Sequence, residues 1–390
     1  MNLVLVPFHD WRKIQIEGFR TRDAHFIESL SRQKHIRKLI VNRPTTPMEI
    51  NLKRKPGLIR GKVMFRERGA TLYEISENLF LIDFVSWDIL GQIRRGYRWF
   101  IKKYSDDRYH RYINKAMGII GFGADFTLVI QNVFAHGISQ GLTPNRTIFD
   151  AWDNFTRFRV YSDIQDEVHK AYINLAKESD CWITNSPENI ETFKKSFKPR
   201  EIHLITNGVD LYRFSVQPDA ENQPKDMEAI PRPIIGFGGK ISQLIDVELL
   251  NQTMELCPEL SFVFVGQILD KEVFQGILKL PNFYFLGDKH YDLYPDYVRS
   301  FDICILPYVT GTNNKSGANS IKVYEYLSLQ KKVVGTRSSG MEELQAYAYV
   351  IDNVQEFSKE LKKPENRKKS LDANAHSWNA KVKQLLSLID

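Results

Sequence analysis

The sequence predicts an α/β protein made of two doubly wound domains, each built on a parallel sheet. Short apolar runs of strand length alternate with helical patterns along most of the chain, which is typical of βαβ units. The length of 390 residues also exceeds what one hydrophobic core usually supports. A polar, proline-containing stretch at 215–233 has almost no apolar periodicity, which predicts a linker between two halves.

The apolar runs give the expected strands in chain order. In the first half we expect strands at 2–6, 38–41, 79–84, 127–130, 147–149, 181–184 and 202–205. In the second half we expect strands at 233–238, 261–265, 283–286, 303–306, 332–334 and 347–351. The predicted domains are therefore residues 1–214 and 234–365, with a further C-terminal segment at 366–390.

Composition argues against a membrane-spanning, secreted or disulfide-rich protein. No apolar run approaches 18 residues, so we expect no helix that spans a membrane. The first residues, 1–7, are too short for a signal-peptide core and predict a buried strand. The three cysteines, Cys181, Cys257 and Cys304, are scattered, which indicates neither a disulfide framework nor a zinc site. We expect a cytoplasmic protein.

Residues 301–340 predict a binding site at the end of a sheet. They form a strand, a polar loop, a helix and a second strand, and ligands of open α/β sheets lie beyond the carboxyl ends of the strands. Asn319, Ser320 and Lys322 stand where the helix begins, and Glu325 follows one turn later. Lys322 suits a phosphate and Glu325 suits vicinal hydroxyls, which a sugar nucleotide offers together. The alternative is an ordinary solvated pair of charges at i and i+3.

The run 319–336 resembles the donor-site signature of GT-B glycosyltransferases, which is roughly Pro/Ser-x-Lys-x-x-Glu-Tyr-Leu-Ala-x-Gly-Lys-Pro-Val-Val. Gln330 replaces the usual Gly and Lys332 the usual Pro, at positions that carry no donor contact in the signature. Gly317 stands where retaining members often have a second Glu, which favours an inverting mechanism. The resemblance adds Tyr324 to the expected donor-binding residues.

Further segments match the same family in the same order. They lie at 176–187, 205–214, 235–242, 281–287 and 376–379. The resemblance implies two Rossmann-like domains facing a cleft, with the acceptor on the first and the nucleotide sugar on the second. It also implies that the C-terminal helix crosses back to the first domain.

The first loop of the second half is expected to approach the diphosphate of the donor. Gly236, Gly238 and Gly239 would let the backbone come close to phosphate, and Lys240 stands where many members carry an Arg. On its own, a Gly-x-Gly-Gly turn is more often just a tight loop.

Two aspartates are candidates for the catalytic base. Residues 148–158 resemble a segment of bacterial polysaccharide glycosyltransferases and, more distantly, the segment of the xanthan glucuronosyltransferase that supplies its base. An inverting transfer needs one group to take the proton of the acceptor hydroxyl, and we predict Asp153 first and Asp150 second. Either could instead cap the helix that follows.

The loop after the first strand is rich in polar residues, namely His9, Asp10, Arg20, Arg22, Asp23 and His25. In a GT-B protein this loop lines the acceptor side. Arg20 or Arg22 could therefore meet a lipid diphosphate, and His25 is an alternative base. Exposed arginines at a helix start are, however, also common.

Basic residues concentrate in the first half, where residues 1–210 hold 33 Lys and Arg against 24 Asp and Glu. At 87–111 they recur at roughly helical spacing between aromatic residues. A basic helix with an aromatic face suits the headgroup layer of an anionic membrane, with Arg94, Arg95 and Arg98 near lipid phosphates. The alternatives are an ordinary amphipathic helix or a nucleic-acid surface, although no nucleic-acid motif accompanies the charge.

Taken together, the sequence predicts a glycosyltransferase that uses a nucleoside diphosphate sugar, most simply a UDP-sugar. We expect a hydroxyl of a lipid-linked glycan as acceptor, in capsule or exopolysaccharide assembly, and a peripheral place at the inner face of the cell membrane. No Asp-x-Asp follows a strand, so we expect neither a divalent metal nor another cofactor. The open alternatives are a GT-B sugar-nucleotide epimerase and a non-catalytic sugar-nucleotide or glycan-binding protein.

Overall fold

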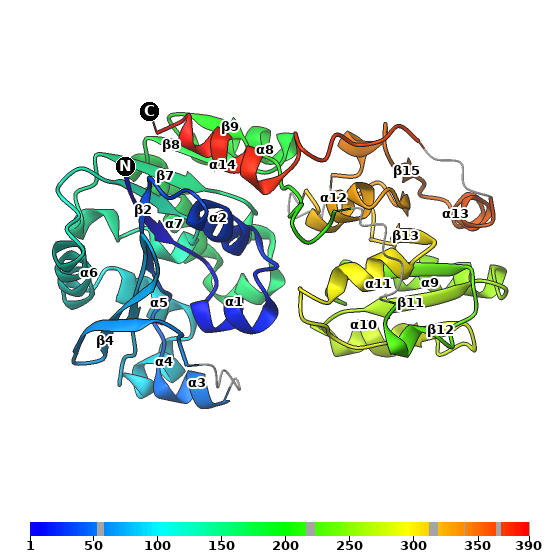
Figure 1. Ribbon diagram of the computed structural model, residues 1–390, viewed down its shortest axis with the longest axis horizontal. Coiled ribbons are helices and arrows are strands. Elements are labelled where there is room, and N and C mark those ends of the chain that lie inside the picture. The colour runs from blue at the N-terminus through cyan, green and yellow to red at the C-terminus, as the bar shows by residue number, and fades with distance from the viewer. Residues whose placement is uncertain (53–57, 216–222, 312–318, 339, 364–367, 390) are drawn as a thin grey trace. The chain divides into compact units, whose positions relative to one another are not determined.

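The computed structural model describes residues 1–52, 58–215, 223–311, 319–338, 340–363 and 368–389. The chain divides into two compact units (Figure 1). Unit 1 comprises Met1–Thr206 with Val382–Asp390, and unit 2 comprises Asn207–Lys381.

Unit 1 is built on a nine-stranded sheet in the order β3-β4-β5-β2-β1-β6-β7-β8-β9. The strands are β1 Asn2–Val6, β2 Arg37–Val41, β3 Lys62–Glu67, β4 Ala70–Ser76, β5 Leu79–Phe84, β6 Thr127–Ile130, β7 Arg146–Asp150, β8 Cys181–Thr184 and β9 Ile202–Leu204. All neighbours are parallel except β3–β4 and β4–β5, which are antiparallel.

Each expected strand of the first half is confirmed, but the sequence did not reveal β3 and β4. The edge strand β3 is largely exposed and carries Lys62, Arg66 and Glu67, so it lacks the apolar run of a buried strand. Charged residues on an edge strand also hinder pairing with other chains. The signal that we used for buried parallel strands does not detect such an edge.

The helices of unit 1 pack on this sheet and bury most of their aromatic residues. They are α1 Trp11–Glu17, α2 Arg22–Ser31, α3 Pro47–Leu52, α4 Ile89–Arg95, α5 Tyr97–Tyr104, α6 Asp107–Ile119, α7 Gln165–Glu178 and α8 Pro187–Phe197. Tyr172 of α7 stacks on Phe197 of α8 with 4.7 Å between the ring centroids, and both rings belong to the hydrophobic core.

The basic segment at 87–111 is not one helix. Gly96, with φ of 53°, separates α4 from α5, and α6 begins after a second break. Trp99, Phe100 and Tyr104 of α5 are buried in the core of unit 1. The aromatic face that the sequence suggested for a membrane therefore packs inside the protein, where these rings belong to the hydrophobic core.

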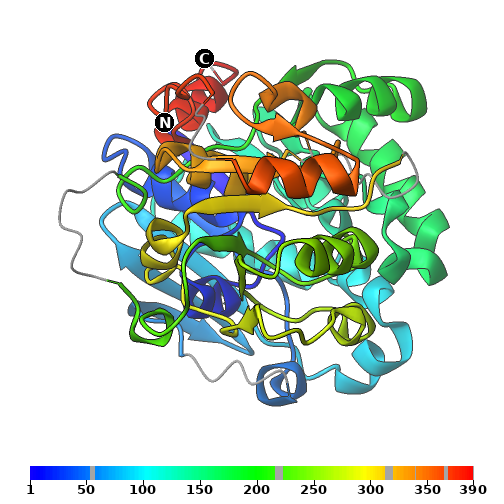
Figure 2. The ribbon, with the colours of Figure 1, turned by 90° about the vertical axis from the view of Figure 1, so that its right-hand side faces the viewer.

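Unit 2 has a six-stranded parallel sheet in the order β12-β11-β10-β13-β14-β15. Its strands are β10 Ile234–Gly238, β11 Ser261–Val265, β12 Phe283–Phe285, β13 Ile303–Leu306, β14 Lys332–Gly335 and β15 Tyr349–Val350, and all were expected. Its helices are α9 Val247–Leu256, α10 Lys271–Gly276, α11 Tyr294–Ser300, α12 Ile321–Ser328 and α13 Val354–Leu361. Figure 2 shows α9 and α13 side by side against the sheet, where Cys257 Sγ lies 3.8 Å from the carbonyl oxygen of Ser358.

The boundary between the units lies earlier than the sequence suggested. Val209 and Phe214, which we assigned to the first domain, are buried in the core of unit 2. Met227 and Ile230, within the expected linker, are buried in the same core, while its residues 216–222 lie outside the described part of the chain. The sequence around Met227 and Ile230 is polar, so its pattern did not indicate that these two side chains are buried.

The predicted C-terminal segment at 366–390 contains α14, Trp378–Leu386. Just before it, the amide of Val209 donates to the carbonyl oxygen of His376 at 2.9 Å, and the amide of Trp378 donates back to Val209 at 3.1 Å. No helix among the described residues has the length and apolar character needed to cross a membrane.

The centre of the unit 2 sheet depends on close backbone packing. A Cβ atom on Gly236 of β10 would overlap the ring of Phe301. Gly118 of α6, in contrast, has no atom within 4 Å of its would-be Cβ, so it provides a matched comparison.

We predict that Gly236→Ala destabilises the protein by about 1–3 kcal/mol, because the new methyl group forces Phe301 out of place. Gly118→Ala is expected to be neutral or mildly stabilising, because alanine favours a helix. Urea unfolding of both variants measures the difference. Equal stability of the two variants would contradict the packing seen around β10.

Candidate functional site

In the sheet of unit 2, the order in which successive strands are added reverses at β10. The chain continues from β10 to β11 and β12 on one side and returns to β13 and β14 on the other. In open α/β sheets, the crevice at such a switch point, beyond the carboxyl ends of the strands, is where ligands bind. The loop after β10 and the loop after β13 border this point.

Lys322 of α12 places its ammonium group at this switch point. Its Nζ donates to the hydroxyl of Tyr308, just after β13, at 2.6 Å, and lies 5.0 Å from the ring centroid of Phe237 in β10. A Cβ atom on Gly239 would overlap this Nζ. Among the described residues no carboxylate forms an ion pair with Lys322, so its ammonium group can meet an incoming anion at this point.

Glu325 lies one turn further along α12 and is 3% exposed. It accepts a hydrogen bond from the hydroxyl of Tyr291. Burial raises the pKa of Glu325 to about 7, against the opposing effects of the Tyr291 hydrogen bond and the charge of Lys322. This side chain can therefore change its protonation state near neutral pH.

Two backbone amides of the predicted phosphate loop already donate hydrogen bonds within unit 2. The amide of Gly238 donates to the hydroxyl of Tyr326 at 2.8 Å, and that of Gly239 donates to the carbonyl oxygen of Val265 at 2.8 Å. Glycine at 239 instead makes room for Lys322, and Lys240 beside it is half-buried. Gly239 thus makes room for a cation, while its own amide and that of Gly238 are engaged within the unit.

Asn319 and Tyr324 support the start of α12. The side-chain oxygen of Asn319 accepts from the amide of Asn207 at 2.8 Å, and its nitrogen donates to the hydroxyl of Tyr324 at 2.9 Å. Both residues are buried, so their side chains are engaged inside the unit. Ser320 is the N-cap residue of α12 but makes no side-chain capping bond, and residues 312–318, including Gly317, lie outside the described residues.

Polar residues gather at the corresponding edge of unit 1, where β1 lies between β2 and β6. Asp150, the last residue of β7, accepts from Nε of Arg22 at 3.0 Å and from the side chain of Gln131 at 3.0 Å. Asp150 is 1% and Arg22 4% exposed. These two predicted site residues therefore hold one another in a buried ion pair.

Asp153 lies in the turn after β7 and is 7% exposed. One of its carboxylate oxygens accepts from the amide of Asn154 at 3.0 Å, and its carbonyl oxygen accepts from the hydroxyl of Tyr172. Asn154 rather than Asp153 caps the short 3₁₀ helix Phe155–Arg157. The predicted base is thus part of a firmly held turn.

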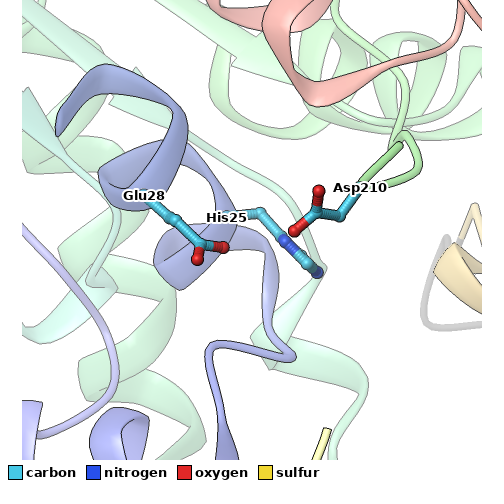
Figure 3. Close-up of side chains that lie close together, drawn as sticks. All are labelled: His25, Glu28 and Asp210. Atoms are coloured by element: carbon cyan, nitrogen blue, oxygen red, sulfur yellow. The ribbon is translucent and has the colours of Figure 1, made fainter. Parts of the chain in front are cut away.

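His25, the other predicted base, lies on α2 and is 1% exposed. Figure 3 shows His25 and Glu28 leaving neighbouring turns of this helix. Asp210, also drawn there, belongs to unit 2, where its carboxylate pairs with Arg213.

The predicted phosphate-binding arginines differ in their surroundings. Arg20 pairs with Glu17 at 3.0 Å, and Arg98 pairs with Glu167. Arg94 and Arg95 are exposed at the end of α4. Acidic neighbours thus compensate Arg20 and Arg98, whereas Arg94 and Arg95 present their charge to solvent.

The structure also reveals a His–Asp pair that we did not single out from the sequence. Nδ1 of His9 lies 3.0 Å from both carboxylate oxygens of Asp23. The amide of His9 also donates to Asp23 at 2.9 Å. His9 and Asp23 are 14 positions apart in the sequence, so no local motif predicts their contact.

The fold of the whole chain is shared with solved structures of very different sequence. The UDP-forming α,α-trehalose-phosphate synthase from Burkholderia xenovorans, in complex with glucose-6-phosphate, matches with a TM-score of 0.68 at 11% identity over 100% of both chains. HepE from Anabaena, in complex with UDP and glucose, matches with a TM-score of 0.66 at 13% identity over 100% of this chain and 99% of HepE. The chain has the GT-B fold.

Enzymes of another type share this GT-B fold. UDP-GlcNAc 2-epimerase from Neisseria meningitidis, bound to UDP-GlcNAc, matches with a TM-score of 0.56 at 12% identity over 100% of this chain and 99% of the epimerase. No protein-family model matches the sequence. The GT-B fold therefore restricts the chemistry without fixing it.

One curated relative is TuaH of Bacillus subtilis (strain 168), provisionally assigned as a teichuronic acid biosynthesis glycosyltransferase. It is 30% identical over 205 residues, which cover 50% of this chain and 50% of TuaH. The chain thus spans about half the length of the curated relative that it matches.

The raised pKa of Glu325 predicts a pH dependence of stability. Between the ordinary pKa of a glutamate and about 7, folded Glu325 keeps a proton that the unfolded chain releases, so stability falls as pH rises from 5 to 8. Glu325→Gln cannot titrate, so its stability relative to wild type should rise over this window by about 3 kcal/mol.

Urea midpoints of wild type and Glu325→Gln at pH 5, 6, 7 and 8 measure this effect. Glu248→Gln, which removes an exposed carboxylate from α9, is the matched control. A constant difference between wild type and Glu325→Gln across the pH range would contradict the buried state of Glu325.

Proposed function

We propose that this protein is a glycosyltransferase that moves a sugar from a nucleoside diphosphate sugar to a hydroxyl acceptor. The observation that carries this proposal is the ammonium group of Lys322, which lies at the switch point of unit 2 with buried Glu325 one turn away. The GT-B fold and the half-length similarity to TuaH support the same function.

The donor is proposed to bind unit 2. Lys322 attracts the diphosphate, and Glu325 accepts hydrogen bonds from the ribose hydroxyls once it is ionised. We propose a UDP-sugar because HepE was solved with UDP and glucose and the epimerase with UDP-GlcNAc. The lysine can stabilise the departing diphosphate electrostatically, which supports transfer without a divalent metal.

The acceptor is proposed to be a lipid-linked glycan at an anionic membrane, in cell-surface polysaccharide synthesis. Unit 1 offers a suitable surface, the α3–α4 patch, made of Leu52, Trp87, Leu90 and Ile93, which are 74%, 78%, 68% and 60% exposed. The helices adjoin one another through a 2.8 Å hydrogen bond from Gln92 to Glu49. Figure 1 shows α3 beside α4, and exposed Arg94 and Arg95 follow Ile93 directly in the chain.

An epimerase is the second candidate, because the solved structures that share the fold include a UDP-GlcNAc 2-epimerase. The two activities differ in a simple way. An epimerase converts the sugar nucleotide without an acceptor and releases no nucleotide, whereas a transferase releases the nucleotide as it passes on the sugar.

Binding of UDP, GDP, dTDP and CMP, followed as thermal stabilisation, tests the donor site. A ligand at 100 times its Kd stabilises the folded protein by about 2.7 kcal/mol. We expect stabilisation by UDP, and a Kd roughly ten- to a hundredfold weaker in Lys322→Ala, since a charge-assisted hydrogen bond contributes about 1.5–3 kcal/mol.

Lys359→Ala, which removes an exposed lysine of α13, should bind UDP like wild type. Equal UDP binding by wild type and Lys322→Ala would remove the main support for the donor site. No response to any of the four nucleotides would argue against nucleotide-sugar chemistry.

Sedimentation with lipid vesicles tests the α3–α4 patch. We expect binding to vesicles containing phosphatidylglycerol but not to pure phosphatidylcholine, with about 1 kcal/mol lost for each arginine removed in Arg94→Ala and Arg95→Ala. The double variant Trp87→Ser/Leu90→Ser should also lose binding, because these side chains enter the apolar layer. Val160→Ser, at an exposed site outside the patch, is the control.

A further inference from the structure

A small cavity lies at the edge of the unit 2 sheet that is opposite the proposed donor site. Residues at the starts of β14 and β15 border it, whereas the donor site lies beyond the ends of β10 and β13. Because these strands are parallel, their starts and their ends lie at opposite edges of the sheet. We call this cavity the β14 pocket, and its polar lining includes Gln330, Lys331, Lys332, Tyr349, Lys368 and Lys369.

The lining of the β14 pocket is strongly cationic. Four of its residues are lysines, and none of the described lining residues is acidic. Nζ of Lys332 lies 5.0 Å from the centroid of the Tyr349 ring, and Nζ of Lys368 lies 4.8 Å from the same centroid. Two ammonium groups from distant segments of the chain therefore meet at one aromatic wall.

Carboxylates of the described residues neutralise only part of this charge. Lys332 is buried and pairs with Glu360 at 2.8 Å. Nζ of Lys368 donates to the carbonyl oxygen of Gln345 at 2.7 Å, which orients the ammonium group without cancelling its charge. No carboxylate in the described part of the chain forms an ion pair with Lys368 or Lys369. An anion in the β14 pocket would therefore lower the electrostatic energy of these groups.

The dipole of α12 accounts for some of these lysines but not for all of them. Lys331 and Lys332 follow the end of α12, where cations are favoured. Lys331 also donates to the carbonyl oxygen of Phe301 at 2.7 Å. Lys368 and Lys369 belong to a separate exposed segment, so their place beside the other two needs another explanation.

The β14 pocket also contains both departures from the GT-B donor signature. Gln330 stands in place of the usual Gly, and Lys332 stands in place of the usual Pro. Gln330 has a φ of 56°, which lies in the left-handed region that favours glycine. Both replacements add a polar or cationic side chain to the lining. The chemistry of this pocket is therefore a feature of this chain that the signature lacks.

The size of the β14 pocket restricts the class of ligand. Its volume is about 50 Å³. A buried water needs about 10–15 Å³ of such volume, so the pocket has room for about four water-sized groups. The oxygens of one phosphate group fit this space, whereas pockets for whole organic ligands measure about 300–1,000 Å³. Lysine ammonium groups are common partners of phosphate oxygens.

We propose that the β14 pocket binds one phosphate group, either as inorganic phosphate or as the end of a small phosphate ester. Lys368 and Lys369 supply charge, and the side-chain amide of Gln330 donates a further hydrogen bond. Lys332 and Tyr349 form the fixed wall behind the ligand. This site is separate from the donor site, and its existence does not depend on the proposed glycosyl transfer.

Equilibrium dialysis of the full chain with radiolabelled inorganic phosphate tests the proposal. We expect saturable binding to wild type in a phosphate-free buffer of low ionic strength. Lys368→Ala should weaken this binding about ten- to a hundredfold, because a charge-assisted hydrogen bond is lost. Lys369→Ala should weaken it as well, so the test does not depend on the folding of one variant. Lys368→Arg keeps the charge and should restore binding.

Two control variants locate the bound phosphate. Lys322→Ala removes the cation of the proposed donor site and should keep the binding that Lys368→Ala loses. Lys271→Ala removes an exposed lysine from the start of α10, which connects β11 and β12 at the far side of the same sheet. It should bind phosphate like wild type.

Competition with glycerol 3-phosphate distinguishes the two sources of the phosphate group. Displacement of the labelled phosphate would support a phosphate ester as ligand, and displacement by unlabelled phosphate alone would support the free ion. Three results would overturn the proposal. They are no saturable binding to wild type, equal binding by wild type and both alanine variants at 368 and 369, and loss of all binding in Lys322→Ala.

Discussion

The parallel arrangement of the central strands in each sheet is the constraint on which both candidate sites depend. Parallel strands end at the same edge of a sheet. In each unit, the next strand lies on one side of the first strand and a later strand lies on its other side. Loops diverge at that point, so the backbone leaves space for a ligand. In unit 2 the space after β10 and β13 receives Lys322, and in unit 1 the loop after β1 presents His9.

The charged groups at the ligand-binding edges of the two sheets are arranged differently. In unit 2 the ammonium group of Lys322 forms no ion pair with a carboxylate of the described residues and is held by the hydroxyl of Tyr308 and the ring of Phe237. That arrangement favours an incoming anion. In unit 1 buried Asp150 is paired with Arg22, and His9 faces solvent only in part. Such pairing suits the binding of an uncharged hydroxyl, whose proton needs an acceptor rather than a counter-ion.

Rigidity around both edges comes from side chains that link distant segments. Asn319 joins the start of α12 to Asn207, and Tyr326 of the same helix accepts from the amide of Gly238. Phe8 anchors the His9 loop on aromatic rings. Binding groups held in this way lose little conformational entropy when a ligand arrives, which favours both affinity and catalysis.

The sequence by itself determined the α/β class, the strands of unit 2 and the positions of Lys322 and Glu325, because apolar runs and helix starts are local signals. It missed the exposed edge strand β3, and it placed Trp99 and Phe100 on a surface that the fold buries. Only the tertiary structure decided which polar groups meet. Arg22 reaches Asp150 across 128 residues, and Tyr291 reaches Glu325 across 34. Such pairs follow from the order of strands in a sheet, which no local pattern specifies, and they decide which side chains remain available for chemistry.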